Sequence, residues 1–279
     1  MARRTTIHDL RRMKRNGEKI AMVTCYDYAS ARIIDNIGFP AILVGDSLGM
    51  TMLGHDSTLR VTLDGMIHHA RAVTRGTTKA MVVMDLPFGT YSGSDLPLSL
   101  QTAKRAIAEG GATAIKIEGG RRMAPVVGTL VASGIPVMGH IGLTPQSIHM
   151  IGGYRVQGRG DEAGERLLAA ALALEEAGAF AIVLECVPAA LAKRLSDKLT
   201  IPTIGIGAGP ECDGQVQVWH DILGLVGEFK PRHAKQYADV ASTIRDAAKA
   251  YFDEVTSGSF PQADHSFDFD ELLDPPAEH

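Results

Sequence analysis

Residues 41–50 read AILVGDSLGM, a short apolar run that ends in an aspartate and a serine followed by glycine. The run lacks the strict polar alternation of a strand with one face in water, so it predicts a strand buried on both faces. Such strands are typical of parallel sheets that are covered by helices. The polar pair Asp46 and Ser47 marks one end of this predicted strand.

Similar apolar runs recur along the chain, separated by segments of helical length. They are KIAMVTCYD (19–27), KAMVVMDLP (79–87), AIKIEGG (114–120), IPVMGHIG (135–142), AIVLECVP (181–188) and IPTIGIGAG (201–209). Several of the helical segments end in glycine, as helices often do. A weaker pattern, RHAKQYA (232–238), is the candidate for an eighth strand, and a helix is predicted over 240–255.

Eight strand–helix units predict an α/β fold, a closed (β/α)8 or TIM barrel. An open doubly wound sheet is the alternative, which the lack of GxGxxG after the first strand disfavours. Residues 6–17 predict an extra helix that covers the bottom of the barrel. We expect one barrel domain over 1–256 and an acidic tail over 257–279. The tail is expected to be mobile, with packing on a neighbouring subunit as the alternative.

Composition excludes several classes of function. The net charge is only −4, and no basic stripe with interleaved aromatic residues is present, so we expect no nucleic-acid partner. No apolar run is long enough to span a membrane. The three cysteines show no metal-binding spacing, and the charged N-terminal segment lacks the apolar core of a signal peptide. We therefore expect a cytoplasmic protein that acts on small molecules.

Charged and polar residues interrupt the apolar runs, always toward the carboxyl end of the predicted strand, where TIM barrels carry their chemistry. Burial of an unpaired ionised group costs several kcal/mol, so these residues need partners. They are Asp46, Ser47, Asp85, Lys116, Glu118, His140 and Glu185.

Lys116 and Glu118 share one face of their strand because side chains alternate along it, and that face must be the barrel interior. Asp46, Asp85 and Glu118 are then expected to converge in one mouth. Three carboxylates with no cysteine cluster favour Mg²⁺ or a similar divalent cation. Salt bridges to Lys116 and nearby arginines are the alternative, although one lysine cannot neutralise three acids.

The glycines of residues 205–209 allow two interpretations: a backbone that approaches a phosphate, or a tight turn. Asp213 is predicted to cap the helix that follows. His140 is expected to contact a substrate, since a lone histidine at a strand end is more often a polar contact than a metal ligand.

Seven motifs, in order, resemble the ketopantoate (3-methyl-2-oxobutanoate) hydroxymethyltransferase family over about residues 5–251. They are VGDSLGM (44–50), MDLPFG (84–89), IKIEGG (115–120), MGHIGLTPQS (138–147), GGYRVQG (152–158), LECVP (184–188) and GIGAGPECDGQVQVWHDILG (205–224). The resemblance implies a (β/α)8 barrel of the phosphoenolpyruvate mutase and isocitrate lyase kind. It also implies a large symmetric homo-oligomer, a decamer.

The implied reaction moves a hydroxymethyl group from 5,10-methylenetetrahydrofolate to 3-methyl-2-oxobutanoate, giving 2-dehydropantoate, the first committed step of pantothenate biosynthesis. By matching motifs, Asp46 and Asp85 become Mg²⁺ ligands with Glu118 also at the metal. Asp46, Ser47, Asp85 and Lys116 become contacts to the oxo acid. Glu185 becomes the proton acceptor.

These roles agree with the chemistry, because a cation and Lys116 together stabilise an enolate while Glu185 takes the proton. A Schiff base on Lys116 is disfavoured, since Glu118 on the same face holds the lysine charged. Two other functions stay open: a carbon–carbon lyase, for which Cys212 is the only partial cysteine candidate, and a binding barrel without catalysis.

Overall fold

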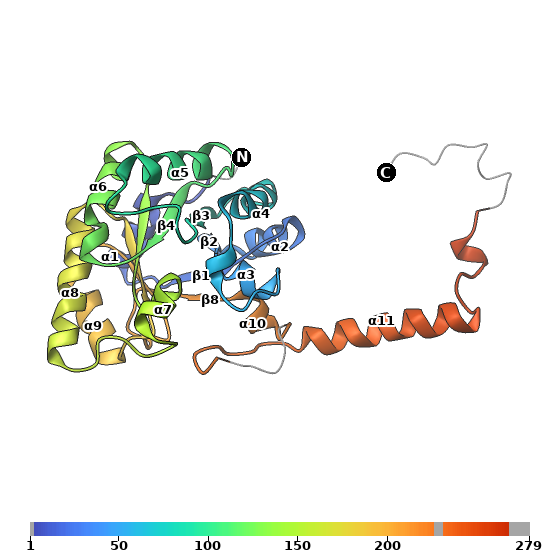
Figure 1. Cartoon of the computed structure of the whole chain (residues 1–279). Coiled ribbons are helices and arrows are strands. Elements are labelled where there is room, and N and C mark those ends of the chain that lie inside the picture. Colours follow the sequence, from blue (N-terminus) through green and yellow to red (C-terminus); the bar gives the residue numbers. More distant parts are fainter. Residues whose placement is uncertain (1–2, 226–230, 268–279) are drawn as a thin grey trace.

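Eight parallel strands close into a barrel in the computed structural model, which describes residues 3–225 and 231–267 (Figure 1). Each strand pairs with its sequence neighbours, and the last pairs with the first. The predicted barrel is therefore confirmed, and the open sheet is excluded. The strands are β1 (Ile20–Thr24), β2 (Ala41–Val44), β3 (Met81–Asp85), β4 (Ala114–Glu118), β5 (Val137–Gly142), β6 (Ala181–Glu185), β7 (Thr203–Ile206) and β8 (Gly214–Gln217).

Helices surround the barrel, and each predicted helical segment before residue 201 contains one. The α-helices are α1 (Ile7–Asn16), α2 (Tyr28–Ile37), α3 (Leu48–Thr51), α4 (Leu63–Arg75), α5 (Leu96–Ala108), α6 (Ala124–Ala132), α7 (Ile148–Ile151), α8 (Asp161–Glu176), α9 (Ala189–Lys198), α10 (Trp219–Leu223) and α11 (Val240–Ser257). Short 3₁₀ turns occur at Thr58–Arg60, Arg121–Met123, Pro145–Ser147 and Ala263–His265.

The extra helix α1 closes the amino end of the barrel, as predicted. Thr6 begins the helix with a capping box, and Gly17 ends it in the left-handed conformation. Leu10 is fully buried among the residues that fill the barrel interior. The Lys14 Nζ atom lies 2.7 Å from Asp213 Oδ2, next to the start of β8, which ties the helix to the strand ends.

The predicted position of the eighth strand is wrong. Residues 232–238, all of which the structure describes, form no strand. The eighth strand, β8, instead lies at Gly214–Gln217, between β7 and β1. This strand is only four residues long and its burial alternates, because Gln215 and Gln217 are half-buried. It therefore lacks the apolar run that marks the others. Gly214 is required there, since a Cβ would collide with the Ile20 carbonyl on β1.

Asp213 is not a helix cap, which corrects a second prediction. Its Oδ2 accepts hydrogen bonds from Thr203 N (2.8 Å) and Thr203 Oγ1 (2.9 Å), so it links β8 to β7. The glycines before it form a tight turn: Gly207 and Gly209 have positive φ, and a Cβ on Gly209 would collide with Ala189 of α9. The close approach is thus to protein, which favours the turn interpretation over a phosphate site.

Side chains of the strands pack in two layers, one between the barrel and the helices and one inside the barrel. Ile115 and Ile117 pack outward against the helices, as predicted. Small and medium side chains such as Val83, Ala114 and Met138 fill the barrel interior. Alternation along β4 therefore places Lys116 and Glu118 inside, toward the carboxyl ends of the strands.

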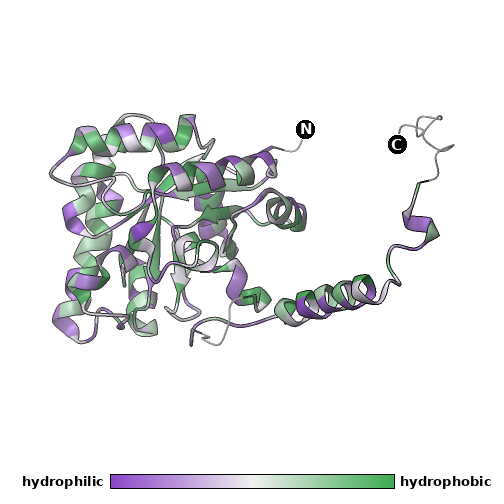
Figure 2. Ribbon diagram, turned by 45° about the vertical axis from the view of Figure 1, so that its right-hand side comes forward, coloured by the Kyte–Doolittle hydropathy of each residue, from purple (hydrophilic) through white to green (hydrophobic). Residues whose placement is uncertain are grey.

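Helix α11 extends away from the barrel (Figure 1), and none of its residues is buried in the single chain. Apolar and polar residues mix along its length (Figure 2). Residues 268–279 of the predicted tail lie outside the described residues, so the division at residue 256 stays a prediction. Among the described residues, no helix has both the length and the apolar character needed to cross a membrane.

Candidate active site

Five neighbouring strands, β2 to β6, deliver the polar residues predicted from the sequence to one end of the barrel. The register pairs Asp85 with Lys116, Glu118 with His140, and Gly142 with Glu185. Asp46 and Ser47 follow β2 directly. Parallel strands bring their carboxyl ends to the same rim, which is why residues from separate runs meet here.

Asp46 and Asp85 lie side by side, and Lys116 completes the group. The Asp46 backbone N–H donates to Asp85 Oδ2 at 3.1 Å, and Lys116 Nζ lies 2.9 Å from Asp85 Oδ1. All three side chains are almost fully buried. The ion pair accounts for one aspartate of the two, so the second carboxylate has no lysine of its own.

Burial and mutual repulsion shape the protonation of this group. Burial, followed by the charges of Asp85 and Glu118, raises the pKa of Asp46 well above its usual range. Burial also raises the pKa of Asp85, against the opposing effect of Lys116. For Lys116, burial acts to lower the pKa, but Asp85, Glu118 and Asp46 outweigh it and raise the pKa. Lys116 is therefore charged at neutral pH.

His140 lies between two carboxylates. Its Nδ1 is 3.5 Å from Glu118 Oε1 and 3.2 Å from Lys116 Nζ, and its Nε2 is 3.2 Å from Glu185 Oε2. Burial and Lys116 act to lower the pKa of His140, yet the nearby carboxylates of Glu118 and Glu185 outweigh them and raise it to about 9. The imidazole is nearly inaccessible, so it is placed to orient Glu118 and Glu185. Its expected contact with a substrate stays a prediction.

Glu118 is held by contacts to Gln146 and His140. Its Oε2 accepts a hydrogen bond from the backbone N–H of Gln146 at 2.9 Å, while its Oε1 faces His140. Burial acts to raise the pKa of Glu118, but the hydrogen bond and charge of His140 lower it overall. Asp46 and Asp85 are thus adjacent, Gln146 bonds to both Asp46 and Glu118, and the expected meeting of the three acids at one metal stays a prediction.

Two residues at the site escaped the sequence reasoning, Gln146 and Tyr91. Gln146 Nε2 donates to Asp46 Oδ2 at 2.8 Å and to the Leu86 carbonyl at 3.0 Å. The Tyr91 hydroxyl donates to Gln146 Oε1 at 2.7 Å and accepts from the Glu118 N–H at 2.9 Å. Tyr91 lies in a loop and Gln146 in the 3₁₀ turn Pro145–Ser147, and neither is charged, so neither strand pattern nor charge marks them. Gln146 does lie inside the motif MGHIGLTPQS.

Ser47 stands at the edge of the mouth. Its hydroxyl lies 2.9 Å from the Tyr26 hydroxyl, and Tyr26 is fully buried beneath it. Ser47 itself stays partly accessible. A small molecule that enters the mouth therefore meets this hydroxyl, next to Asp46 in sequence.

The residues present fit one divalent cation at Asp46 and Asp85. With every group ionised, four carboxylates face two cationic side chains, so two negative charges are left uncompensated. Among the residues that the structure describes, no group of three or more His, Cys, Asp and Glu side chains lies ready to hold a metal. Two buried carboxylates nevertheless match Mg²⁺, which takes one or two carboxylates and fills its other positions with water and substrate oxygens.

Cys212, the partial candidate for a lyase-type loop cysteine, is fully buried. Burial raises the pKa of its thiol. A buried, protonated thiol is a poor nucleophile or acid at the mouth. The residue therefore offers no support for the lyase alternative.

Several solved structures share this barrel at low sequence identity. Phosphonopyruvate hydrolase, in complex with oxalate and Mg²⁺, aligns with a TM-score of 0.58 at 13% identity, covering 96% of this chain and 93% of that one. 2,3-Dimethylmalate lyase, a member of the PEP mutase/isocitrate lyase superfamily, aligns with a TM-score of 0.57 at 18% identity, covering 96% and 94%. These similarities show that the chain shares the barrel fold of these proteins.

Close relatives are enzymes with one name. The 3-methyl-2-oxobutanoate hydroxymethyltransferase of Chloroflexus aurantiacus is 58% identical over 263 residues, which are 94% of this chain and 92% of that protein. The enzyme of the same name from Geotalea daltonii is 54% identical, covering 96% of this chain and all of that protein. The family model for ketopantoate hydroxymethyltransferase matches residues 4–263. The chain, which gathers Asp46, Asp85, Lys116 and Glu185 at one end of a (β/α)8 barrel, belongs to the ketopantoate hydroxymethyltransferase family.

Proposed function

We propose that this protein transfers a hydroxymethyl group from 5,10-methylenetetrahydrofolate to 3-methyl-2-oxobutanoate, giving 2-dehydropantoate and tetrahydrofolate. The C3–H bond of the oxo acid breaks, and a bond forms between C3 and the one-carbon unit. The bonds between that carbon and the folate nitrogens break, and water supplies the hydroxyl oxygen. The product is the committed precursor of pantothenate.

Glu185 takes the C3 proton in this proposal. It ends β6 at the rim, and its side chain is more accessible than those of Asp46, Asp85, Lys116 and Glu118. His140 Nε2 lies 3.2 Å from one carboxylate oxygen and leaves the other free to receive a proton. A positioned carboxylate of this kind contributes about 10²–10⁴-fold to proton transfer.

Lys116, Ser47, Asp46 and Asp85 bind and orient the oxo acid at the same end of the barrel. Asp46 and Asp85 would hold Mg²⁺ or a similar cation, with Glu118 nearby. When bound, the cation supplies positive charge beside the oxo acid's carboxylate and carbonyl oxygens. Lys116 adds a fixed charge close to the same oxygens, where burial makes it effective. The Ser47 hydroxyl is available to donate to the substrate carboxylate.

One arrangement carries the proposal: Lys116 pairs with Asp85 beside Asp46, and His140 lies between Lys116 and Glu185 at the same end of the barrel. It separates the groups that favour negative charge on the substrate from the group that removes the proton. A barrel that only binds ligands has no need for that division.

The test uses 3-methyl-2-oxobutanoate and Mg²⁺ in deuterated water, followed by addition of 5,10-methylenetetrahydrofolate. We expect deuterium at C3 before the folate is added and 2-dehydropantoate afterwards. Release of pyruvate or glyoxylate from a longer acid, without exchange at C3, would indicate a lyase. Thermal stability that does not respond to Mg²⁺ and oxo acid, together with no exchange, would indicate a barrel that does not bind this substrate.

We also propose a homo-oligomer, a decamer by resemblance, and a cytoplasmic location. Helix α11 supports the first idea, since Ile244, Phe252 and Val255 are exposed in the single chain. Within the described residues, all three cysteines are free, which is consistent with a reducing compartment. The protein is expected to act on small molecules without nucleic-acid or membrane partners.

A further inference from the structure

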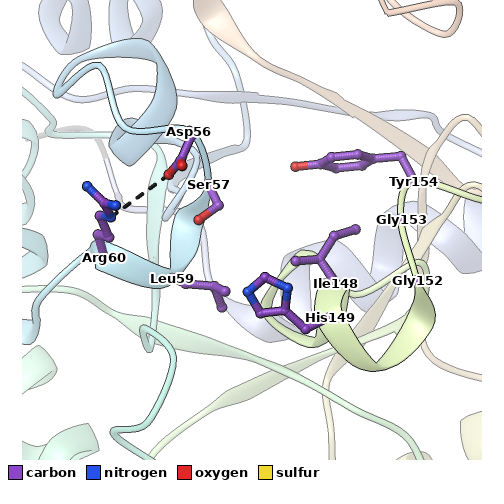
Figure 3. A pocket seen from close by; sticks show the side chains of 9 residues that line it. All are labelled: Asp56, Ser57, Leu59, Arg60, Ile148, His149, Gly152, Gly153 and Tyr154. Atoms are coloured by element: carbon purple, nitrogen blue, oxygen red, sulfur yellow. Dashed lines mark ion pairs between the residues drawn. The ribbon is translucent and has the colours of Figure 1, made fainter.

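A cavity of about 540 Å³ opens between two loops that leave the barrel on the active-site side (Figure 3). One wall comes from the segment after α3, with Asp56 and Leu59 at the 3₁₀ turn Thr58–Arg60. The other wall comes from α7 and the residues after it, with Ile148 and Tyr154. The volume lies in the range of cavities that take drug-sized molecules.

The two walls of the cavity follow residues of the candidate active site in the chain. Helix α3 begins directly after Ser47. Gln146, two residues before Ile148, donates to Asp46 and so holds the second wall against the first. The Tyr154 hydroxyl lies 3.9 Å from Met50 Sδ on α3. Tyr154, which lines the cavity, therefore lies beside the helix that follows Ser47.

The charges of the candidate active site also act on the side chain of Tyr154, which lines the cavity. Burial, followed by the charges of Glu185, Asp46 and Glu118, raises the pKa of Tyr154. The ring of Tyr154 is still 61% exposed and faces the cavity (Figure 3). A flat partner can therefore pack on it, with Leu59 and Ile148 offering apolar surface nearby.

Asp56 gives the cavity a hydrogen-bond acceptor. Its carboxylate is 78% exposed, and its ion pair with Arg60 spans 3.9 Å, beyond hydrogen-bond range. Both carboxylate oxygens are thus available to a ligand. A carboxylate accepts two parallel bonds from a planar edge that carries neighbouring N–H groups.

We propose that this cavity binds the pterin ring of the folate donor, with the ring packed on Tyr154 and its amino–amide edge donating to Asp56. The inference rests on the proposed function, because it names the binding site for the second substrate of that reaction. It accounts for the position of the cavity, since the one-carbon unit must lie within bonding distance of the oxo acid held at Asp46 and Lys116.

The test compares Asp56→Asn and Tyr154→Ala with two matched controls. Asp64→Asn is the control for charge, because Asp64 is also an exposed acid paired to an arginine but lies on α4, outside the cavity lining. Tyr154→Phe keeps the ring. Two quantities are measured: the KM for 5,10-methylenetetrahydrofolate, and the Kd of tetrahydrofolate alone by calorimetry under anaerobic conditions.

We expect Asp56→Asn and Tyr154→Ala to raise both quantities about tenfold or more, as loss of a charged hydrogen bond or of a stacked ring does. Both controls should stay within about twofold of the wild type. The KM for 3-methyl-2-oxobutanoate in the C3 exchange reaction, which needs no folate, should move far less than the KM for folate.

An unchanged Kd for tetrahydrofolate in both cavity variants would overturn the inference, while transfer by the wild type would leave the proposed function intact. Absence of transfer activity in the wild-type protein would instead contradict the proposed function. The calorimetric Kd would still decide, in that case, whether the cavity binds a folate.

Discussion

Replacement of Gln146 by leucine isolates the contribution of one neutral side chain to the candidate active site. The amide joins three partners: Asp46 Oδ2 at 2.8 Å, the Leu86 carbonyl at 3.0 Å and the Tyr91 hydroxyl at 2.7 Å. Leucine has nearly the same volume but forms none of these bonds. Asp46 then keeps its burial and its repulsion by Asp85 without the amide that counteracts them.

The magnitude follows from these contacts. A hydrogen bond to a charged group contributes about 1.5–3 kcal/mol, and a buried neutral bond about 1 kcal/mol. We therefore expect the free energy of unfolding to fall by about 3.5–5 kcal/mol at pH 7. Residues that orient metal-binding carboxylates change metal affinity or activity by about 10–100-fold. The Mg²⁺-dependent affinity for 3-methyl-2-oxobutanoate should fall by about that factor.

Calorimetric titration of the folded variant with the oxo acid at fixed Mg²⁺ measures the affinity, and urea denaturation measures the stability. Gln215→Leu is the matched control, because the Gln215 amide donates to the Gly209 carbonyl at 2.9 Å and contacts no acid of the site. This control should lose stability while its affinity stays near that of the wild type. An affinity within twofold of the wild type in Gln146→Leu would refute the reasoning.

Three further predictions concern separate parts of the chain. Burial acts to raise the pKa of Asp35, but hydrogen bonds from Ala80, Thr78 and Lys79 outweigh it and lower the pKa. The ionised Asp35 carboxylate therefore stabilises the folded state fully above pH ~4, and this stabilisation is lost as pH falls further. The difference in unfolding free energy between wild type and Asp35→Asn should shrink from pH 7 to pH 3, and a constant difference would contradict this. Lys116 should stay a charged amine, so borohydride added with the oxo acid should leave the protein mass unchanged; a mass gain would reveal a Schiff base. Phe252→Asp on α11 should lower the molar mass measured by light scattering, whereas an unchanged assembly would remove α11 from the interface.

The sequence predicts most of the barrel because its strands are apolar on both faces. Seven strands show this pattern, and each predicted helix between them is present. The eighth strand, β8, lacks this apolar pattern, because its alternate residues, Gln215 and Gln217, are polar and only half-buried. Its place is set by pairing with β1 and β7, which is tertiary information.

The candidate site is predicted in part for a similar reason. Charged residues at strand ends are visible in the sequence, and the fold brings them to one rim. The register between strands is not visible, and it makes His140 the direct neighbour of Glu118. Glu118 therefore contacts His140. Gln146 lies in a short 3₁₀ turn and Tyr91 in a loop, where no periodicity constrains the position of a side chain.

We expect Glu185 to remove the C3 proton of an oxo acid held by Asp46, Asp85 and Lys116. The most direct measurement is the rate of C3 deuterium exchange, without folate, in the wild type and in Glu185→Gln at saturating oxo acid and Mg²⁺. We predict that the variant binds the oxo acid with nearly unchanged affinity and exchanges about 10²–10⁴-fold more slowly. Exchange at the wild-type rate in Glu185→Gln would contradict the account.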